Sequence, residues 1–404
     1  MLRLVALIAL TGCLREPVFQ GNRDGGSDAA DTGDADTGIP PTGVTATAQA
    51  GRLVVAGPFY QMQFSASGAR YPESLSVAGS ANALAVADSP CGIGSGVGIS
   101  AAPGFALDGD RGSANEPTIE YAGPAVVKVT MAWTQQFTCG AATNTPTGTS
   151  TFTFFPSGQI VRHDSIAFAG ENVTPSCPCD SLGTFLVNSH WTFHRSELPI
   201  EPPPPAAGIE VPSESGSTQV CAASVDHSIL FGFEGPAASS HMVLTTSGVG
   251  GDGYGLFSNI IPPASTLSSA SGRVTTQVLL AAGAGHCLEL SQRMLVLRNP
   301  TISVTASEPG GANPKLLMPS PRDGVYGGET VEVAPVTDAI ELTGTTGAVP
   351  AGFAVKLAFL GPRTNIRVSR SVSDYLLTRP TPESAIVYFL SALGATPIEI
   401  IAEP

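Results

Sequence analysis

Positive charge is scarce in this sequence. Its 404 residues include 19 Lys and Arg against 33 Asp and Glu, which gives a formal net charge of −14. Only three lysines occur, Lys128, Lys315 and Lys356. Proteins that bind nucleic acid or anionic lipid gather basic residues into a patch or stripe, and this sequence contains no such cluster. Nucleic acid is therefore excluded as a partner.

Motifs of common catalytic and cofactor sites are also missing. The chain has no G-x-S-x-G nucleophile elbow, no H-E-x-x-H zinc motif and no phosphate-binding P-loop. Residues 248–253 match the dinucleotide pattern G-x-G-x-x-G literally, but Tyr254 and its successors do not begin a helix. No acidic residue follows about twenty positions later, as that pattern requires. We interpret 248–253 as a glycine-rich loop and predict no bound cofactor.

Composition and periodicity favour strands. Charged residues are only 13% of the chain, while glycine and proline occupy 46 and 34 positions. Apolar and polar residues alternate in 60–65, 126–133 and 353–360, which is typical of antiparallel strands with one buried face. The segment 151–165 predicts two strands around a turn at 156–158, whereas 382–394 fits a helix or a strand. The predicted fold is all-β, with two antiparallel β-sandwich domains or one large double sandwich.

A proline run predicts the main internal boundary. Pro202–Pro205 favours a stiff, extended segment that cannot donate to a sheet. We place a linker at 199–212, between a β-sandwich domain at 44–198 and a second β-rich domain at 213–404.

The N-terminus has the pattern of an export signal. Arg3 precedes the apolar run 4–10, which is too short to cross a bilayer. The run ends in Leu10-Thr11-Gly12-Cys13, which resembles the lipobox of bacterial lipoprotein signal peptides. The resemblance implies removal of residues 1–12 and acylation of Cys13, so that a lipid holds the protein on a membrane. Leu14 stands where an aspartate would retain such a protein at the inner membrane, which implies the outer membrane of a Gram-negative bacterium.

Residues 13–43 predict a disordered tether between the lipid and the folded body. The segment is rich in Asp, Gly, Thr and Ala, and so it buries too little apolar surface to offset its ordering entropy. Asp34 and Asp36 resemble the start of a calcium loop. However, Gly38 stands at the third ligand position, Ile39 replaces the required glycine, and no glutamate occupies the twelfth position. We therefore predict no metal here.

Six cysteines remain once Cys13 is assigned to lipid. An even number in an oxidising compartment predicts three disulfides among Cys91, Cys139, Cys177, Cys179, Cys221 and Cys287. Cys221 and Cys287 would form the bridge of the second half. Cys177 and Cys179 are too close to bond each other, so each pairs with Cys91 or Cys139 in one of two connectivities.

Histidines near the Cys-Pro-Cys segment mark the candidate site. The alternative to disulfides is a metal ion bound by Cys177, Cys179, His190 and His194. However, the cysteines of zinc sites usually have two to four residues between them, and here there is only one. If 185–194 is one strand, His190 and His194 share its polar face, opposite Trp191 and Phe193. Arg162, His163 and Asp164 form a second polar group with acid–base potential.

These patterns predict a lipid-anchored envelope or cell-surface protein that binds a glycan or a protein partner without catalysis. The alternatives are an exported polysaccharide-acting enzyme, a lyase or hydrolase that uses His163, Asp164, Arg162 and His190, and a structural protein of the envelope. Only 2 Trp and 7 Tyr are present, which argues against a broad aromatic platform for glycans.

Overall fold

The computed structural model describes the chain from Gly43 to its C-terminus, with gaps. The described residues are 43–49, 51–64, 72–79, 98–101, 112–114, 116–135, 137–139, 142–145, 147–167, 182–187, 190–195, 198–200, 209–212, 217–223, 227–234, 241–245, 254–258, 271–283, 285–298, 302–306, 314–317, 321–322, 325–326, 331–336, 339–344 and 351–404. Most of them lie in strands, as the sequence predicts. The one helix among them, α1 (Cys287–Arg298), is too short to cross a membrane.

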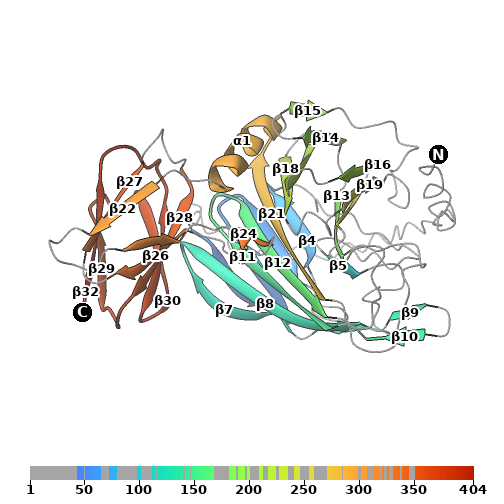
Figure 1. Ribbon diagram of the computed structural model, residues 1–404, viewed down its shortest axis with the longest axis horizontal. Helices are drawn as coiled ribbons and strands as arrows, with labels where there is room; N and C mark the ends of the chain where they lie inside the picture. Colours follow the sequence, from blue (N-terminus) through green and yellow to red (C-terminus); the bar gives the residue numbers. More distant parts are fainter. Residues whose placement is uncertain are drawn as a thin grey trace, which may run out of the picture.

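A ten-stranded antiparallel sheet forms the centre of the larger body (Figure 1). Its order is β15-β14-β17-β18-β21-β12-β11-β8-β6, and β7 also pairs with β8. Its strands are β6 (Gly112–Ala114), β7 (Thr118–Gly123), β8 (Val126–Gln135), β11 (Thr147–Phe154), β12 (Gln159–Ala167), β14 (His190–Arg195), β15 (Leu198–Ile200), β17 (Ser217–Ala223), β18 (His227–Glu234) and β21 (Ser271–Ala282).

A four-stranded sheet packs on one face of this large sheet. It runs in the order β1 (Thr45–Gln49), β2 (Arg52–Ala56), β3 (Tyr60–Phe64) and β4 (Pro72–Val77). The predicted alternation is confirmed in both sheets. In β3 the side chains of Tyr60, Met62 and Phe64 are buried, and in β8 those of Val127, Val129, Met131 and Trp133 are buried. These faces meet in one hydrophobic core.

Three smaller sets of strands complete the larger body. A five-stranded sheet has the order β16 (Ile209–Pro212), β19 (His241–Thr245), β20 (Tyr254–Ser258), β13 (Leu182–Val187) and β5 (Gly98–Ala101). Two short antiparallel pairs are β9 (Phe137–Cys139) with β10 (Ala142–Asn144), and β24 (Pro321–Arg322) with β25 (Val325–Tyr326).

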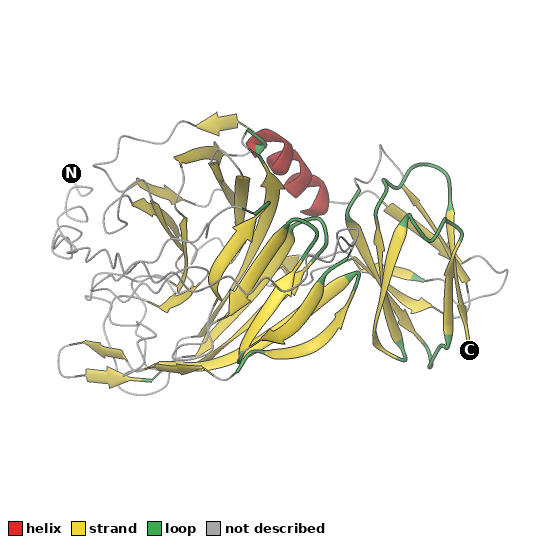
Figure 2. Cartoon of the chain, turned by 180° about the vertical axis from the view of Figure 1, so that it is seen from behind, coloured by secondary structure: helices red, strands yellow, loops and turns green. Residues whose placement is uncertain are grey.

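The C-terminal body is a second, smaller β-sandwich (Figure 2). One sheet runs β22 (Ile302–Ala306), β27 (Ala339–Gly344), β32 (Ile398–Glu403), β29 (Asn365–Val368), and the other runs β23 (Lys315–Leu317), β26 (Val331–Val336), β28 (Phe353–Phe359), β31 (Ser384–Phe389), β30 (Tyr375–Thr381). All described pairings in them are antiparallel except β26 with β28. The segment 382–394 contains β31 and no helix. Its buried run of β-branched and aromatic residues suits a central strand.

The predicted boundary at 199–212 is wrong. Strand β12 precedes the predicted linker and β21 follows it, yet the two strands pair over nine residue pairs. One sheet therefore contains strands from both sides of the predicted boundary. The predicted linker itself contributes β15 to the large sheet and β16 to the five-stranded sheet. The chain first enters the C-terminal sandwich later, between α1 and β22, and β24 and β25 then lie against the larger body again. A proline run disfavours sheet pairing only at its own positions, and it does not prevent flanking strands from pairing.

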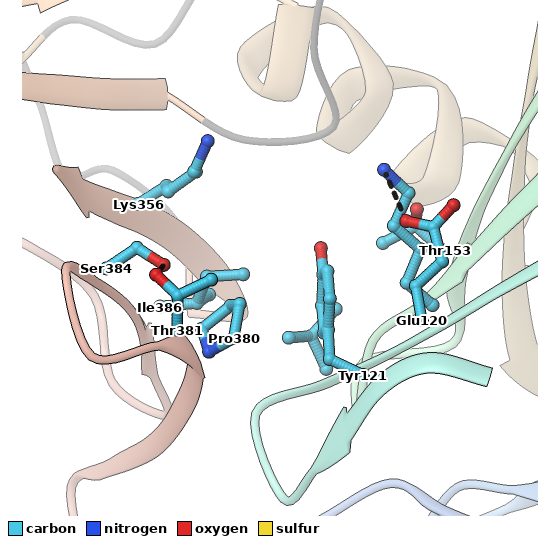
Figure 3. A pocket seen from close by; sticks show the side chains of 10 residues that line it. Glu120, Tyr121, Thr153, Lys356, Pro380, Thr381, Ser384 and Ile386 are labelled. Atoms are coloured by element: carbon cyan, nitrogen blue, oxygen red, sulfur yellow. Dashed lines mark hydrogen bonds and ion pairs between the residues drawn. The ribbon is translucent and has the colours of Figure 1, made fainter.

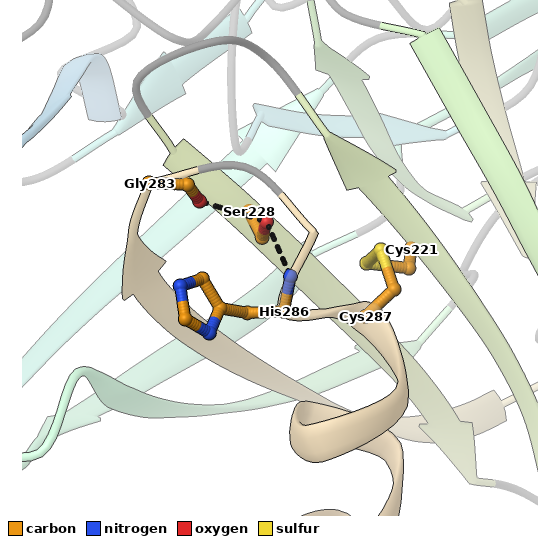
Figure 4. Close-up of a disulfide and its surroundings, with 5 residues drawn as sticks. All are labelled: Cys221, Ser228, Gly283, His286 and Cys287. Carbon is orange, nitrogen blue, oxygen red and sulfur yellow. Dashed lines mark hydrogen bonds between the residues drawn. A yellow bond between two sulfur atoms is a disulfide. The ribbon is translucent and has the colours of Figure 1, made fainter.

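The predicted Cys221–Cys287 disulfide is confirmed. It joins β17 to the first residue of α1, and both cysteines are buried (Figure 4). Beside it, the Ser228 hydroxyl donates to the Gly283 carbonyl at 3.0 Å and accepts from the His286 backbone N–H at 3.4 Å. These bonds fix the turn that leads into the helix.

The other cysteine predictions fall outside the described side chains. The structure describes only the backbone of Cys139, and Cys13, Cys91, Cys177 and Cys179 lie outside the described residues, as do the tether and the glycine-rich loop.

The two bodies meet through a packed junction. The rings of Phe155 and Tyr388 stack with their centres 6.2 Å apart, within a buried cluster that also contains Val126 and Ile386. The backbone N–H of Ala125 donates to the Thr378 hydroxyl across the junction at 3.0 Å. Apolar packing and a buried hydrogen bond therefore stabilise this junction.

Two buried tyrosines at this junction predict a loss of stability at alkaline pH. Burial raises the pKa of Tyr60 well above 10, and nearby Tyr388 adds to this effect. Burial also raises the pKa of Tyr388, although Ser157 and Arg293 partly oppose the shift. The unfolded chain releases these phenol protons near pH 10, whereas the folded chain retains them. The free energy of unfolding should therefore be unaffected below pH 10 and decrease above it, by up to about 1.4 kcal/mol per pH unit for each tyrosine.

Urea unfolding at pH 9, 10 and 11 measures this effect. In the Tyr60→Phe/Tyr388→Phe variant, the free energy of unfolding should decrease less steeply above pH 10 than in the native chain. The control is Tyr375→Phe, at a half-buried tyrosine in β30, which should show the same decrease as the native chain. An equal slope in the double variant and the native chain would contradict the prediction.

Candidate functional site

The structure keeps His190 and His194 in one strand but separates both from His163. Residues 185–194 do not form one strand, because β13 ends at Val187 and β14 begins at His190 in a different sheet. His190 and His194 lie in β14, while His163 lies in β12, four strands away across the large sheet. Neighbouring strands are about 4.8 Å apart, which separates these backbones by about 19 Å. A joint catalytic group of His163 and His190 is not formed.

Arg162 is part of the interior and not of a groove. Its side chain is 0% exposed, and its guanidinium lies 5.4 Å from the centre of the Phe152 ring. His163, the next residue, is half-buried on the opposite face of the sheet, as strand alternation requires. Asp164 follows in β12, where the structure describes only its backbone. Arg162 therefore lies in the core and does not share a surface with His163.

A cavity between the two bodies is the candidate site in the described part of the chain. Its volume is about 320 Å³, and side chains from both bodies line it (Figure 3). The lining residues are Glu120, Tyr121, Val126, Lys128, Thr153, Lys356, Pro380, Thr381, Ser384 and Ile386. The size is at the lower end of small-ligand sites, which combine apolar walls with a few polar groups.

A β-bulge shapes the wall that the large sheet provides. The pairing of β7 with β8 shifts between Ile119 and Tyr121, and so Glu120 is the extra residue. Neighbouring residues in a regular strand point to opposite faces, but here both Glu120 and Tyr121 line the cavity. The Glu120 carboxylate lies 3.3 Å from the Lys128 ammonium and accepts a hydrogen bond from the Thr130 hydroxyl.

The opposite wall comes from the C-terminal sandwich. The hydroxyls of Thr381 and Ser384 are 2.8 Å apart at the turn between β30 and β31, and Pro380 lies just before them. The Lys356 ammonium, from β28, donates to the Glu332 carboxylate at 2.9 Å. Figure 3 shows Tyr121 between the two walls, with Lys356 on one side and Glu120 on the other.

Thr153, like Ser384, is a buried polar residue of the cavity wall. Its side chain is 1% exposed, and in the described part of the chain its hydroxyl oxygen has no hydrogen-bond partner. A buried hydroxyl without a partner is destabilising, and natural proteins retain few of them. A group of this kind in a cavity wall is suited to a ligand that supplies the missing hydrogen bond.

Replacement of Thr153 therefore predicts a gain in stability. Thr153→Val keeps the shape of the side chain and removes the unpaired hydroxyl, which should raise the free energy of unfolding by about 1 kcal/mol. The matched control is Thr378→Val. Thr378 is also buried, but its hydroxyl accepts the Ala125 N–H, and so this change should lower stability by about 1–3 kcal/mol. Urea unfolding of both variants checks the opposite signs, and a loss of stability in Thr153→Val would contradict the prediction.

Sequence patterns did not single out this cavity. Its walls come from β7, β8 and β11 on one side and from β28, β30 and β31 on the other, more than 200 positions later. One signal was available, because two of the three lysines of an acidic chain line it. In the described ranges, no group of three or more His, Cys, Asp or Glu side chains is placed to hold a metal ion.

No protein-family model matches this sequence, and neither does any curated protein. Among solved structures, a galactose 1-epimerase from Lactobacillus acidophilus is 11% identical, with a TM-score of 0.33, over 57% of this chain and 94% of its own. A galactose mutarotase-like protein from Lactobacillus casei is 11% identical, with a TM-score of 0.25, over 59% and 100%. A heparinase III is 8% identical, with a TM-score of 0.29, over 76% and 41%. TM-scores below 0.5 assign no function to this chain.

Proposed function

We propose that this protein is a lipid-anchored envelope protein that binds a glycan in the cavity between its two β-sandwich bodies, without chemical change to the glycan. The cavity carries this proposal, because it combines one aromatic ring with several hydroxyl and charged side chains. Sugar rings have apolar C–H faces that pack on aromatic rings and hydroxyl rims that need hydrogen-bond partners. Tyr121 suits the first requirement, and Thr153 and Glu120 suit the second.

The arrangement of charged groups favours binding over catalysis. Glycoside hydrolysis uses two carboxyl groups on either side of the scissile bond, at about 5–9.5 Å from each other. Of the residues that line the cavity, only Glu120 has a carboxylate, and it pairs with Lys128. The predicted alternative, an enzyme that uses His163 and His190 together, has no support from the separation of β12 and β14.

The anchor is a proposal from the sequence. Cys13 in a lipobox-like segment would attach the protein to the outer membrane, and the acidic segment that follows would let the folded body reach beyond the membrane surface. An inhibitor of the lipoprotein signal peptidase should cause an unprocessed precursor to accumulate. Unchanged processing in the presence of the inhibitor would contradict the anchor but would leave glycan binding open.

A glycan array with the purified full chain tests the binding function. At least one glycan class should bind, and Thr153→Val and Tyr121→Ala should each weaken that binding about tenfold, by loss of one hydrogen bond and of the aromatic contact respectively. Val372→Ala, at an 82% exposed position in the C-terminal body, is the control and should bind normally. A parallel screen for polysaccharide degradation should show no turnover. Turnover, or a complete lack of binding, would overturn the proposal.

A further inference from the structure

Two of the three lysines in the chain line the cavity. Lys128 comes from β8 and Lys356 from β28, so the cavity has one ammonium on each wall. The net charge of the chain is −14, and an acidic surface repels anions in general. Positive side chains from both bodies therefore line this cavity.

The Lys356 ammonium is held in position and still has donors to offer. Its side chain is 39% exposed, and its hydrogen bond within the described part of the chain goes to Glu332. An ammonium has three N–H donors, so two remain after this bond. Glu332 does not line the cavity, and it therefore orients Lys356 without blocking the ligand space.

Lys128 differs from Lys356 because its glutamate partner, Glu120, itself lines the cavity. Its ammonium lies 3.3 Å from Glu120 and 6.0 Å from the centre of the Tyr121 ring. Glu120 also lines the cavity, and so this wall presents both signs of charge. A ligand carboxylate would be repelled near Glu120 and attracted near Lys356, whereas ligand hydroxyls can donate to the Glu120 carboxylate. The cavity is therefore electrically asymmetric.

From this asymmetry we infer that the cavity selects an acidic sugar, a hexuronate unit within a glycan. Its carboxylate binds Lys356, its hydroxyls face Glu120 and Thr153, and its ring packs on Tyr121. The inference rests on the proposed glycan-binding function and specifies its ligand class. An ammonium–carboxylate hydrogen bond is charge-assisted and roughly twice as strong as a neutral one.

A comparison of each acidic sugar with its uncharged ester tests whether the cavity selects the carboxylate. Short oligomers of galacturonate, glucuronate and mannuronate are each compared with their methyl esters, which keep the ring and remove the charge. Calorimetry with the full chain should show that at least one acid binds about 10- to 100-fold more tightly than its ester, in the range expected for a hydrogen bond to a charged group. The preference should weaken in 0.5 M salt, because the cavity is open enough for screening.

Variants assign the preference to one residue. Lys356→Gln should remove the advantage of the acid over the ester, and Lys356→Arg should retain most of it. The matched control is Lys315→Gln, which makes the same change in net charge at an exposed residue that does not line the cavity, and it should retain the full preference. Thermal unfolding confirms that each variant is folded.

The possible outcomes separate the inference from the function on which it rests. If acids and esters bind equally, or if Lys315→Gln has the same effect as Lys356→Gln, acidic-sugar selection is overturned and glycan binding stands. If neutral glycans bind and no uronate does, the inference is likewise wrong. If no glycan of any class binds, the proposed function fails as well.

Discussion

The Cys221→Ala/Cys287→Ala variant is expected to lose about 4 kcal/mol in free energy of unfolding. The disulfide closes a loop with a sequence separation of 66 residues, and its removal gives the unfolded chain the corresponding conformational entropy, about 4 kcal/mol for a loop of that length. The bridge also attaches the first turn of α1 to β17. That helix packs its apolar residues into the same core as the C-terminal sandwich, so both bodies should be affected.

Urea unfolding of the full chain under oxidising conditions measures the loss. With dithiothreitol present, native chain and variant should unfold at nearly the same urea concentration, because the reductant opens the bond in the native chain. Equal stability of the two proteins without reductant would show that the bridge does not limit unfolding.

Phe152→Ala is expected to lower the free energy of unfolding by about 3–5 kcal/mol, the usual range for removal of a buried phenylalanine. Phe152 is 0% exposed, and its ring centre lies 5.4 Å from that of Phe64 in the four-stranded sheet. The same ring contacts the buried Arg162 guanidinium at 5.4 Å. The substitution therefore leaves a cavity between two sheets and removes the aromatic neighbour of a buried charge.

Thermal and urea unfolding of Phe152→Ala measure this effect against two comparisons. Phe152→Leu keeps much of the volume and should lose less stability. Val372→Ala, at a residue that is 82% exposed, should change stability by no more than about 0.5 kcal/mol. A loss below about 1 kcal/mol in Phe152→Ala would contradict the assignment of this ring to the centre of the core.

Local patterns predicted the parts of the fold that depend on local physics. Alternation in 60–65 and 126–133 identified the buried faces of β3 and β8, because a strand places successive side chains on opposite sides of a sheet. The turn at 156–158 separates β11 from β12, and Gly158 adopts a positive φ of 76°, which glycine tolerates best. The Cys221–Cys287 pair was predicted from the cysteine count together with the boundary at 199–212, which leaves these two cysteines in the second half. The pair is confirmed although the boundary is not.

The same patterns misplaced Arg162. Alternation identifies two faces of a strand, and a charged residue is normally assigned to the exposed one. Arg162 lies on the buried face because its guanidinium packs on Phe152, in a strand whose next residue, His163, takes the polar face. A sequence pattern does not reveal such a pairing, since Phe152 and Arg162 meet only through the register of β11 with β12.

Sequence patterns alone predicted that this chain is built of antiparallel strands, which faces of β3 and β8 are buried, and that Cys221 pairs with Cys287. These properties follow from steric alternation, turn chemistry and counting, and each acts within a short stretch or on a single residue type. The three-dimensional structure was needed to show that strands from both sides of Pro202–Pro205 share one sheet, and that Lys128 and Lys356 line one cavity. Both depend on pairings between distant segments, which hydrogen-bond register and core packing select and which no local pattern encodes.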